Sequence, residues 1–166
     1  MEPKTTRQLA AIMRIHPGRI DQWISRGQFL PRIFAKAGLS RDWSFDEAMR
    51  LATFIELVDL CGMDPRIAGV LTQAGVHGFR DDGSYFVAYH GDPDEQATGW
   101  SFDIVRKKKI GEFLAGGCPY PKILSAGHSP EVIAENSKPN LGPAYATVMV
   151  DLDRLEQRLR DAWSAD

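Results

Sequence analysis

The stretch HPGRIDQWISRGQFLP, residues 16–31, decides how the N-terminal part of this 166-residue chain folds. Pro17 suits the first turn of a helix, where its missing N–H needs no partner, and Gly27 can end the same helix in the left-handed conformation. At about 100° per residue, the apolar side chains gather on one side of this helix and the polar ones on the adjacent side. The stretch therefore predicts a short amphipathic helix over residues 17–27.

Segments on both sides of this helix have their own signals. Thr5 or Thr6 can cap a preceding helix that runs to about Met13, so that a tight turn joins two short helices. After them, Pro31 and Gly38 interrupt a run of alternating basic and apolar residues, which predicts a small hairpin rather than a helix.

Two further helices are predicted next. Ser44 and Glu47 form the capping-box pattern at the start of a helix that continues to about residue 60. This helix is apolar on more than one side, which indicates burial by several neighbours. Pro65 begins a fourth helix that ends near residue 73. Its expected inward side chains are Ile67, Val70 and Leu71.

Charge is distributed unevenly, although the formal net charge is only −2. Residues 1–41 contain eight basic and two acidic side chains, a formal charge of +6, which leaves −8 for the remainder. Nucleic acid is the obvious partner for a basic N-terminal part, while anionic lipid or simple solubility would also fit. No apolar run approaches the roughly 18–20 residues of a membrane span, so we expect a cytoplasmic protein without a membrane partner.

The sequence gives no support for an enzyme or a metal centre. Cys61 and Cys118 are the only cysteines and lie far apart, so neither a disulfide framework nor a zinc site is predicted. The histidines have no ligand spacing, and the phosphate-cradling, zinc-protease and hydrolase motifs are missing. We therefore expect no catalytic residues, no metal and no cofactor.

The order and the residues of the N-terminal elements resemble the MerR-like winged helix-turn-helix DNA-binding domain, whose relatives include phage excisionases. The matching pieces lie within residues 4–73 and are TTRQLAAIM, RIHPGRIDQWISRGQFLP and RDWSFDEAMRLATFIELVDLCGMDPRIAGVL. The most specific part runs from Trp23 to Pro31, followed by a basic wing. The long dimerisation helix and the cysteines of that family's metal sensors are missing here, so the resemblance does not imply metal sensing.

The resemblance implies that the helix over residues 17–27 enters the major groove of DNA. Within about 100° of its circumference, this helix carries Arg19, Gln22, Trp23 and Arg26. Arginine can contact guanine, and glutamine adenine, through two hydrogen bonds each, whereas Trp23 suits packing on the sugar-phosphate backbone. For any one of these side chains taken alone, an ordinary solvated helix surface is the alternative.

Phosphate contacts are expected from the first helix and from the wing over residues 31–43. Backbone amides at the start of the first helix can bind a phosphate, and the candidates there are Thr5, Thr6 and Arg7. The wing candidates are Arg32, Lys36 and Arg41. An idle basic loop is the alternative for the wing. His16 is also a candidate DNA contact, although a histidine at such a turn more often caps or packs.

Residues 76–166 resemble no family and are predicted as a small α+β domain with an antiparallel sheet and a C-terminal helix. Strands are expected within residues 78–91, 98–108 and 146–151, and short helices over 110–116 and 129–136. The terminal helix has one apolar seam, formed by Leu152, Leu155, Leu159 and Trp163. This seam is the candidate dimerisation surface, and packing on the chain's own sheet is the alternative.

The sequence thus predicts an α+β protein with a mostly helical winged helix-turn-helix domain over residues 1–75 and a dimerisation or partner-binding domain over residues 76–166. The expected function is sequence-specific binding of double-stranded DNA, as a homodimeric, nucleoid-associated transcriptional regulator of a bacterium or phage. Two alternatives stay open. One is a phage or mobile-element architectural protein, such as an excisionase or packaging factor, and the other is a protein-interaction module on the same fold.

Overall fold

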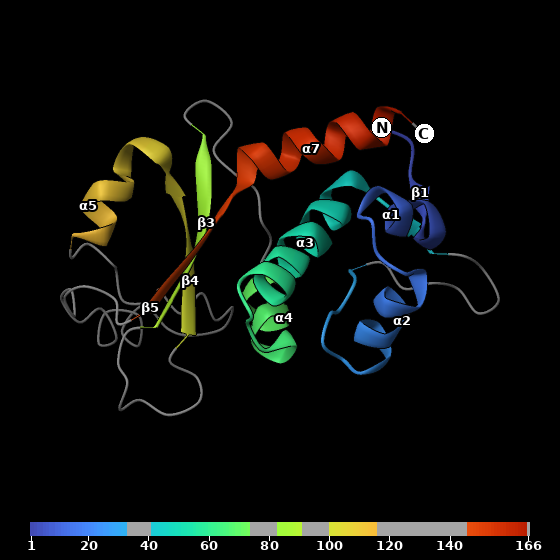
Figure 1. The fold of residues 1–166 in the computed structure, drawn as a ribbon, viewed down its shortest axis with the longest axis horizontal. Coiled ribbons are helices and arrows are strands. Elements are labelled where there is room, and N and C mark those ends of the chain that lie inside the picture. The colour runs from blue at the N-terminus through green and yellow to red at the C-terminus, as the bar shows by residue number, and fades with distance from the viewer. Residues whose placement is uncertain (33–40, 74–82, 91–99, 116–145, 166) are drawn as a thin grey trace, which may run out of the picture. The chain divides into compact units, whose positions relative to one another are not determined.

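The computed structural model describes residues 1–32, 41–73, 83–90, 100–115 and 146–165, and its fold is α+β (Figure 1). The chain divides into two compact units. Unit 1 comprises Met1–Gly78 and Val150–Asp166, and unit 2 comprises Phe79–Met149. The α+β class expected from the sequence is confirmed. None of the helices in the described ranges is long and apolar enough to cross a membrane.

Helices α1 (Thr6–Ile12) and α2 (Pro17–Ser25) begin unit 1 and occur where the sequence predicts them. Both helices are followed by a residue in the left-handed conformation, Arg14 with φ 56° and Gly27 with φ 65°. The next backbone amides then bond to carbonyls of the last helical turn, which closes each helix abruptly. A tight turn therefore joins the two helices.

Helix α3 (Phe45–Ile55) continues directly into a π-helical turn, η1 (Glu56–Leu60). Ser44 caps α3, since its hydroxyl accepts a hydrogen bond from the Glu47 backbone amide at 3.3 Å. Glu47 does not complete the predicted capping box, because its carboxylate binds the Arg50 guanidinium instead. Most of α3 is buried, as its apolar pattern predicts.

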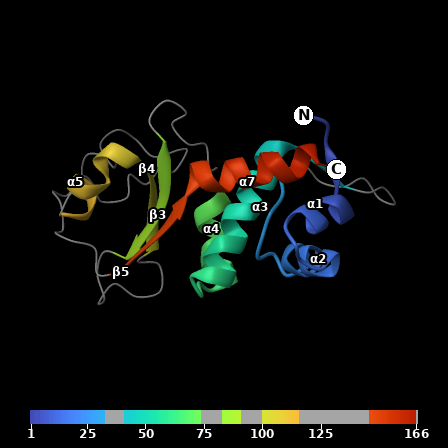
Figure 2. The same cartoon turned by 45° about the horizontal axis from the view of Figure 1, so that its top comes forward.

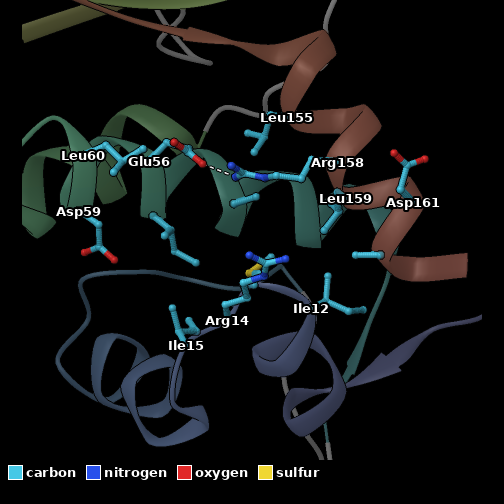
Figure 3. A pocket seen from close by; sticks show the side chains of 14 residues that line it. Ile12, Arg14, Ile15, Glu56, Asp59, Leu60, Leu155, Arg158, Leu159 and Asp161 are labelled. Atoms are coloured by element: carbon cyan, nitrogen blue, oxygen red, sulfur yellow. Dashed lines mark hydrogen bonds and ion pairs between the residues drawn. The ribbon is translucent and has the colours of Figure 1, made fainter. Parts of the chain in front are cut away.

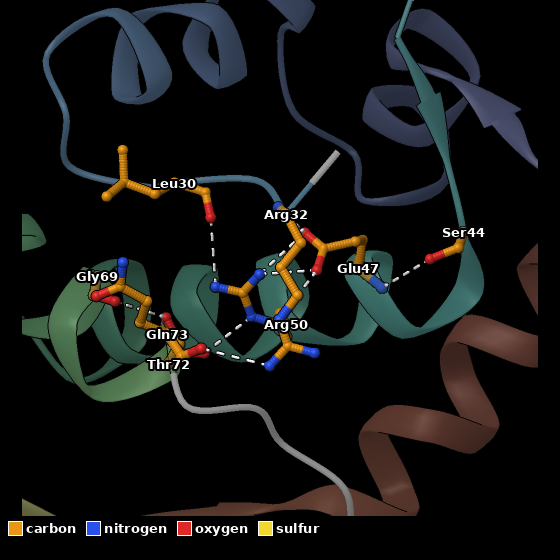
Figure 4. A network of polar contacts seen from close by, with 8 residues as sticks. All are labelled: Leu30, Arg32, Ser44, Glu47, Arg50, Gly69, Thr72 and Gln73. Carbon is orange, nitrogen blue, oxygen red and sulfur yellow. Dashed lines mark hydrogen bonds and ion pairs between the residues drawn. The ribbon is translucent and has the colours of Figure 1, made fainter. Parts of the chain in front are cut away.

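A buried polar network ties α3 to two other segments (Figure 4). Arg50 is 1% exposed, and its Nη1 lies 2.7 Å from Oε1 of Glu47, which is 4% exposed. The same guanidinium donates to the backbone carbonyls of Thr72 at 2.9 Å and Leu30 at 3.4 Å, and Glu47 accepts from the Arg32 amide at 3.2 Å. The network therefore fixes the chain after α2 and the end of the fourth helix onto α3.

Helix α4 (Pro65–Gln73) approaches the segment after α2 very closely. A Cβ at Gly69 would lie 1.8 Å from the carbonyl oxygen of Gln28, so only glycine fits there. The prediction that Val70 points inward is wrong, because its side chain is 69% exposed. The buried residues of α4 are Ala68, Leu71 and Thr72.

The C-terminal helix α7 (Leu152–Ser164) packs against α3 and α1 (Figures 1 and 2). Its seam residues are between 2% and 5% exposed within the single chain, and they are Leu152, Leu155, Leu159 and Trp163. The Trp163 ring contacts Phe45 edge-on, with ring centroids 5.4 Å apart, and its Nε1 donates to the Glu2 carbonyl at 3.1 Å.

This packing corrects two predictions. The seam is not available as a dimerisation surface, because unit 1 already buries it, and its partners are helices rather than the sheet that the alternative assumed. The predicted domain over residues 76–166 also differs from the structure, because Val150–Asp166 belongs to unit 1. Burial of the four seam side chains, at about 1.5–3 kcal/mol each, explains why so short a helix docks there.

Unit 2 is built on a three-stranded sheet in the order β4-β3-β5, formed by β3 (Ser84–His90), β4 (Trp100–Arg106) and β5 (Ala146–Asp151), whose last two residues are already counted with unit 1. Strands β3 and β4 pair antiparallel, with Ser84 opposite Arg106 and His90 opposite Trp100. A short 3-10 turn, η2 (Lys107–Lys109), and helix α5 (Ile110–Leu114) follow β4. The helix predicted over residues 129–136 lies outside the described residues.

The core of unit 2 lies between the sheet and α5. Val87 and Tyr89 of β3, Val105 of β4 and Phe113 of α5 are all buried and form one apolar cluster. Tyr89 and Phe113 meet edge-on, with ring centroids 5.6 Å apart. Strand β3 is buried on both faces, because its four consecutive residues from Phe86 to Tyr89 are at most 3% exposed.

Candidate nucleic-acid interface

Helix α2 has one buried face and one exposed polar face. Ile20 is fully buried and Trp23 is 5% exposed, and the Trp23 ring meets Phe54 of α3 edge-on with centroids 5.0 Å apart. These contacts hold α2 against the core of unit 1. The exposed residues of α2 are Gly18, Asp21, Gln22 and Ser25, and Arg26 follows them as the C-cap.

The predicted outward position of Trp23 is wrong. About 60° separates Trp23 from Ile20 on the helix surface, so a ring of this size reaches the apolar face and is buried between α2 and α3. The predicted recognition face consists of Arg19, Gln22, Trp23 and Arg26, and the burial of Trp23 leaves three of these residues. Trp23 therefore holds α2 against α3, and its ring is not exposed for packing on another molecule.

Arg19 is engaged by an ion pair that the sequence does not reveal. Its Nη1 and Nη2 donate to the two carboxylate oxygens of Asp59 in η1, at 2.8 and 2.5 Å. The same guanidinium lies over the Trp23 ring, 4.6 Å from its centroid. Both terminal nitrogens of the Arg19 guanidinium are thus bound to Asp59, so a bidentate contact with guanine would require this ion pair to break. Asp59 is forty residues away in sequence, and no local pattern marks it.

Gln22 and Arg26 remain as exposed polar side chains one turn apart. With the Gln22 amide oriented so that its oxygen faces Arg26, that oxygen accepts from Nη2 of Arg26 at 2.8 Å. An amide and a guanidinium held in this way present several hydrogen-bond donors along one edge of α2. These two residues are the part of the predicted recognition face that the structure leaves exposed together.

His16 caps α2, the role that a histidine at such a turn more often has. Its Nδ1 accepts a hydrogen bond from the Gly18 backbone amide at 3.2 Å. The acceptor nitrogen is therefore used by the helix itself, and the cap fixes the point where the turn enters α2.

Two of the three phosphate candidates at α1 have structural roles. Thr5 and Gln8 form a reciprocal capping box. The backbone N–H of Gln8 donates to Thr5 Oγ1 at 3.3 Å, and the backbone N–H of Thr5 donates to Gln8 Oε1 at 3.0 Å. Thr6 Oγ1 accepts from Trp43 Nε1 at 3.0 Å. The expected phosphate contact at this helix start therefore falls to the exposed Arg7.

The expected wing is described only at its two ends. Strand β2 (Asp42–Trp43) pairs antiparallel with β1 (Lys4–Thr5), so its described partner lies outside the predicted hairpin. The Arg41 guanidinium lies over the Trp43 ring at 5.6 Å. Lys36, with the rest of residues 33–40, lies outside the described residues.

The remaining wing arginine contributes to the fold. The Arg32 guanidinium donates to the Gln73 carbonyl at 3.4 Å and lies 3.8 Å from the Glu47 carboxylate. Its side chain is still 48% exposed, so it can contact solvent while it supports the end of α4.

Within the described residues, no three histidine, cysteine or acidic side chains gather as a metal site would require. Comparison with protein-family models and with curated proteins finds no match to this chain. The interpretation of α2 therefore rests on its own geometry, on Gln22 and Arg26 exposed opposite a buried face.

Proposed function

We propose that this protein is a sequence-specific double-stranded DNA-binding protein, most simply a transcriptional regulator, with a MerR-like winged helix in unit 1. The observation that carries the proposal is the division of α2. One side is locked to the core by Ile20 and Trp23, and the opposite side exposes Gln22, Ser25 and Arg26. A helix that enters the major groove needs this division, because its base-contacting side chains must be held at a fixed distance from the duplex.

The structure changes the roles of the individual residues in this proposal. Gln22 and Arg26 are the proposed base contacts, since each can form two hydrogen bonds to a base edge. Arg19, bound to Asp59, orients α2 relative to η1 instead of contacting a base. Arg7 of α1 and Arg41, which directly precedes β2, are the proposed phosphate contacts.

The basic N-terminal part supports this proposal further. Its formal charge of +6 over residues 1–41 favours a polyanionic partner, and the remaining −8 keeps that preference local to one part of the chain. A single small module buries a limited area on DNA, so homodimerisation on two half-sites stays a prediction. The dimer surface is not the buried seam of α7, which leaves unit 2 as the proposed dimerisation or partner-binding part.

The experiment that tests the proposal is a fluorescence-anisotropy titration of the full chain with a pool of random duplex DNA at two salt concentrations. We expect binding with a steep salt dependence, which reports phosphate contacts. On a duplex that the wild type selects from this pool, Arg26→Ala should weaken binding by about 5-fold or more, because one base contact of this kind is worth about 1–3 kcal/mol.

Arg154→Ala is the matched control, because it removes an equal charge from an exposed position at the start of α7. This control should bind as the wild type does. No binding at low salt, or equal losses in Arg26→Ala and Arg154→Ala, would contradict the proposal and favour a protein-interaction module. Footprints on bound DNA then separate a regulator, with one site beside a gene, from an architectural protein with clustered, strongly bent sites.

A further inference from the structure

A partly apolar pocket of about 620 Å³ lies within unit 1 between the α1–α2 turn, the α3–η1 helix and α7 (Figure 3). Its apolar wall contains Ile12, Met13, Ile15, Ile55, Leu155 and Leu159. The volume falls in the range of about 300–1,000 Å³ that is typical of small-molecule sites. Neither the proposed DNA contacts nor the buried core uses this space.

Most charged residues at the pocket have a described partner. Glu56 is paired with Arg158 and Asp59 with Arg19, whereas the Asp161 carboxylate keeps its charge and accepts a hydrogen bond from Gln157 Nε2 at 2.7 Å. The remaining charged side chain is Arg14, whose guanidinium has no partner in the described part of the chain and projects between the apolar walls (Figure 3). The pocket therefore offers one available cation beside an apolar surface.

Arg14 also has an unusual backbone conformation for an arginine. Arg14 adopts φ 56°, the left-handed conformation that is unfavourable for residues other than glycine. At the two equivalent helix ends, after α2 and η1, the same conformation is taken by Gly27 and Gly62. The chain thus places an arginine, at a cost in backbone energy, at the one such turn that borders the pocket.

We propose that this pocket binds a small amphipathic carboxylate, with its apolar body against Ile12, Ile15 and Leu159 and its carboxylate on the Arg14 guanidinium. A planar guanidinium matches a carboxylate through two parallel hydrogen bonds, which a cationic or neutral head group cannot form. The paired carboxylates Glu56 and Asp59 repel an anion less than free ones, because their charges are already balanced. The proposal stands independently of DNA binding.

The test is a methyl NMR titration of the full chain, labelled at its isoleucines, with decanoate, decylamine and decanol as probes below their micelle concentrations. We expect saturable shifts at Ile12, Ile15 and Ile55, which line the pocket, and none at the buried Ile20. Decanoate should bind about tenfold more tightly than decylamine, since only its carboxylate can accept charge-assisted hydrogen bonds from the Arg14 guanidinium.

Arg14→Gly is the decisive variant, because glycine adopts the left-handed conformation readily and the fold is therefore retained. This variant should bind decanoate no more tightly than decylamine, while Arg66→Ala, which removes an exposed arginine of α4 outside the pocket, should behave as the wild type. Absence of shifts at the three pocket isoleucines, shifts spread evenly over all isoleucines, or an unchanged decanoate preference in Arg14→Gly would each overturn the proposal.

Discussion

Removal of the buried carboxylate of Glu47 should destabilise unit 1 severely. In Glu47→Leu, the Arg50 guanidinium loses the partner that lies 2.7 Å from its Nη1, while its own burial, at 1% exposure, denies it water. Breaking a buried pair in this way typically costs about 3–5 kcal/mol. Since domains of this size are stable by about 5–15 kcal/mol, the variant should lose a large fraction of its stability.

A double variant distinguishes the stability lost to the unpaired Arg50 charge from the stability lost to a general packing defect. In Glu47→Leu/Arg50→Met, no charge is buried, so we expect at least half of the lost stability to return. Guanidinium chloride unfolding followed by helical circular dichroism measures both values, because most described helices belong to unit 1. A cost below about 1 kcal/mol for the single variant, or additive losses in the double variant, would refute the reasoning.

Four other perturbations follow from single observations. Arg14→Gly should raise the free energy of unfolding by about 0.5–1 kcal/mol, visible as a higher melting temperature, because it relieves the left-handed conformation. Gly69→Ala should lower the free energy of unfolding by about 2 kcal/mol or more, because the new Cβ would overlap a carbonyl, and an unchanged melting temperature would contradict this. Asp59→Asn should release Arg19 and increase the salt slope of DNA binding by about 1, whereas an unchanged slope would show that Arg19 does not reach phosphate. Partial desolvation and the nearby Glu56 carboxylate raise the pKa of the Cys61 thiol, although the residue is exposed, so its alkylation, followed by peptide mapping, should have a midpoint at a higher pH than that of a free cysteine.

The local structure of the N-terminal part could be predicted because its signals are local. Pro17 and Gly27 delimit α2, and Ser44 begins α3, through hydrogen bonds or steric limits that reach no further than a few residues. Strands β3, β4 and β5 of unit 2 were likewise predictable, since their β-branched and aromatic residues stand in short runs. The burial of β3 on both faces was not predictable from its sequence, because it depends on what packs against the sheet.

Contacts between distant segments could not be predicted in this way. The Arg19–Asp59 pair and the docking of α7 on α3 depend on tertiary packing, and neither leaves a periodic signal in the sequence. Trp23 was misplaced because its position on the helical wheel borders both faces, so the depth of the neighbouring α3 surface decides its burial. Arg14 was missed because a left-handed turn usually contains glycine.

The most direct test of the central claim is selection of binding sites from random duplex DNA by the wild type, by Gln22→Ala and by Gln157→Ala as a control on the exposed side of α7. The proposal predicts that the wild type and Gln157→Ala enrich the same defined sequence, and that Gln22→Ala enriches this sequence with one or two positions made degenerate. Enrichment of no sequence by the wild type, or of an identical sequence by Gln22→Ala, would contradict the claim that α2 recognises bases.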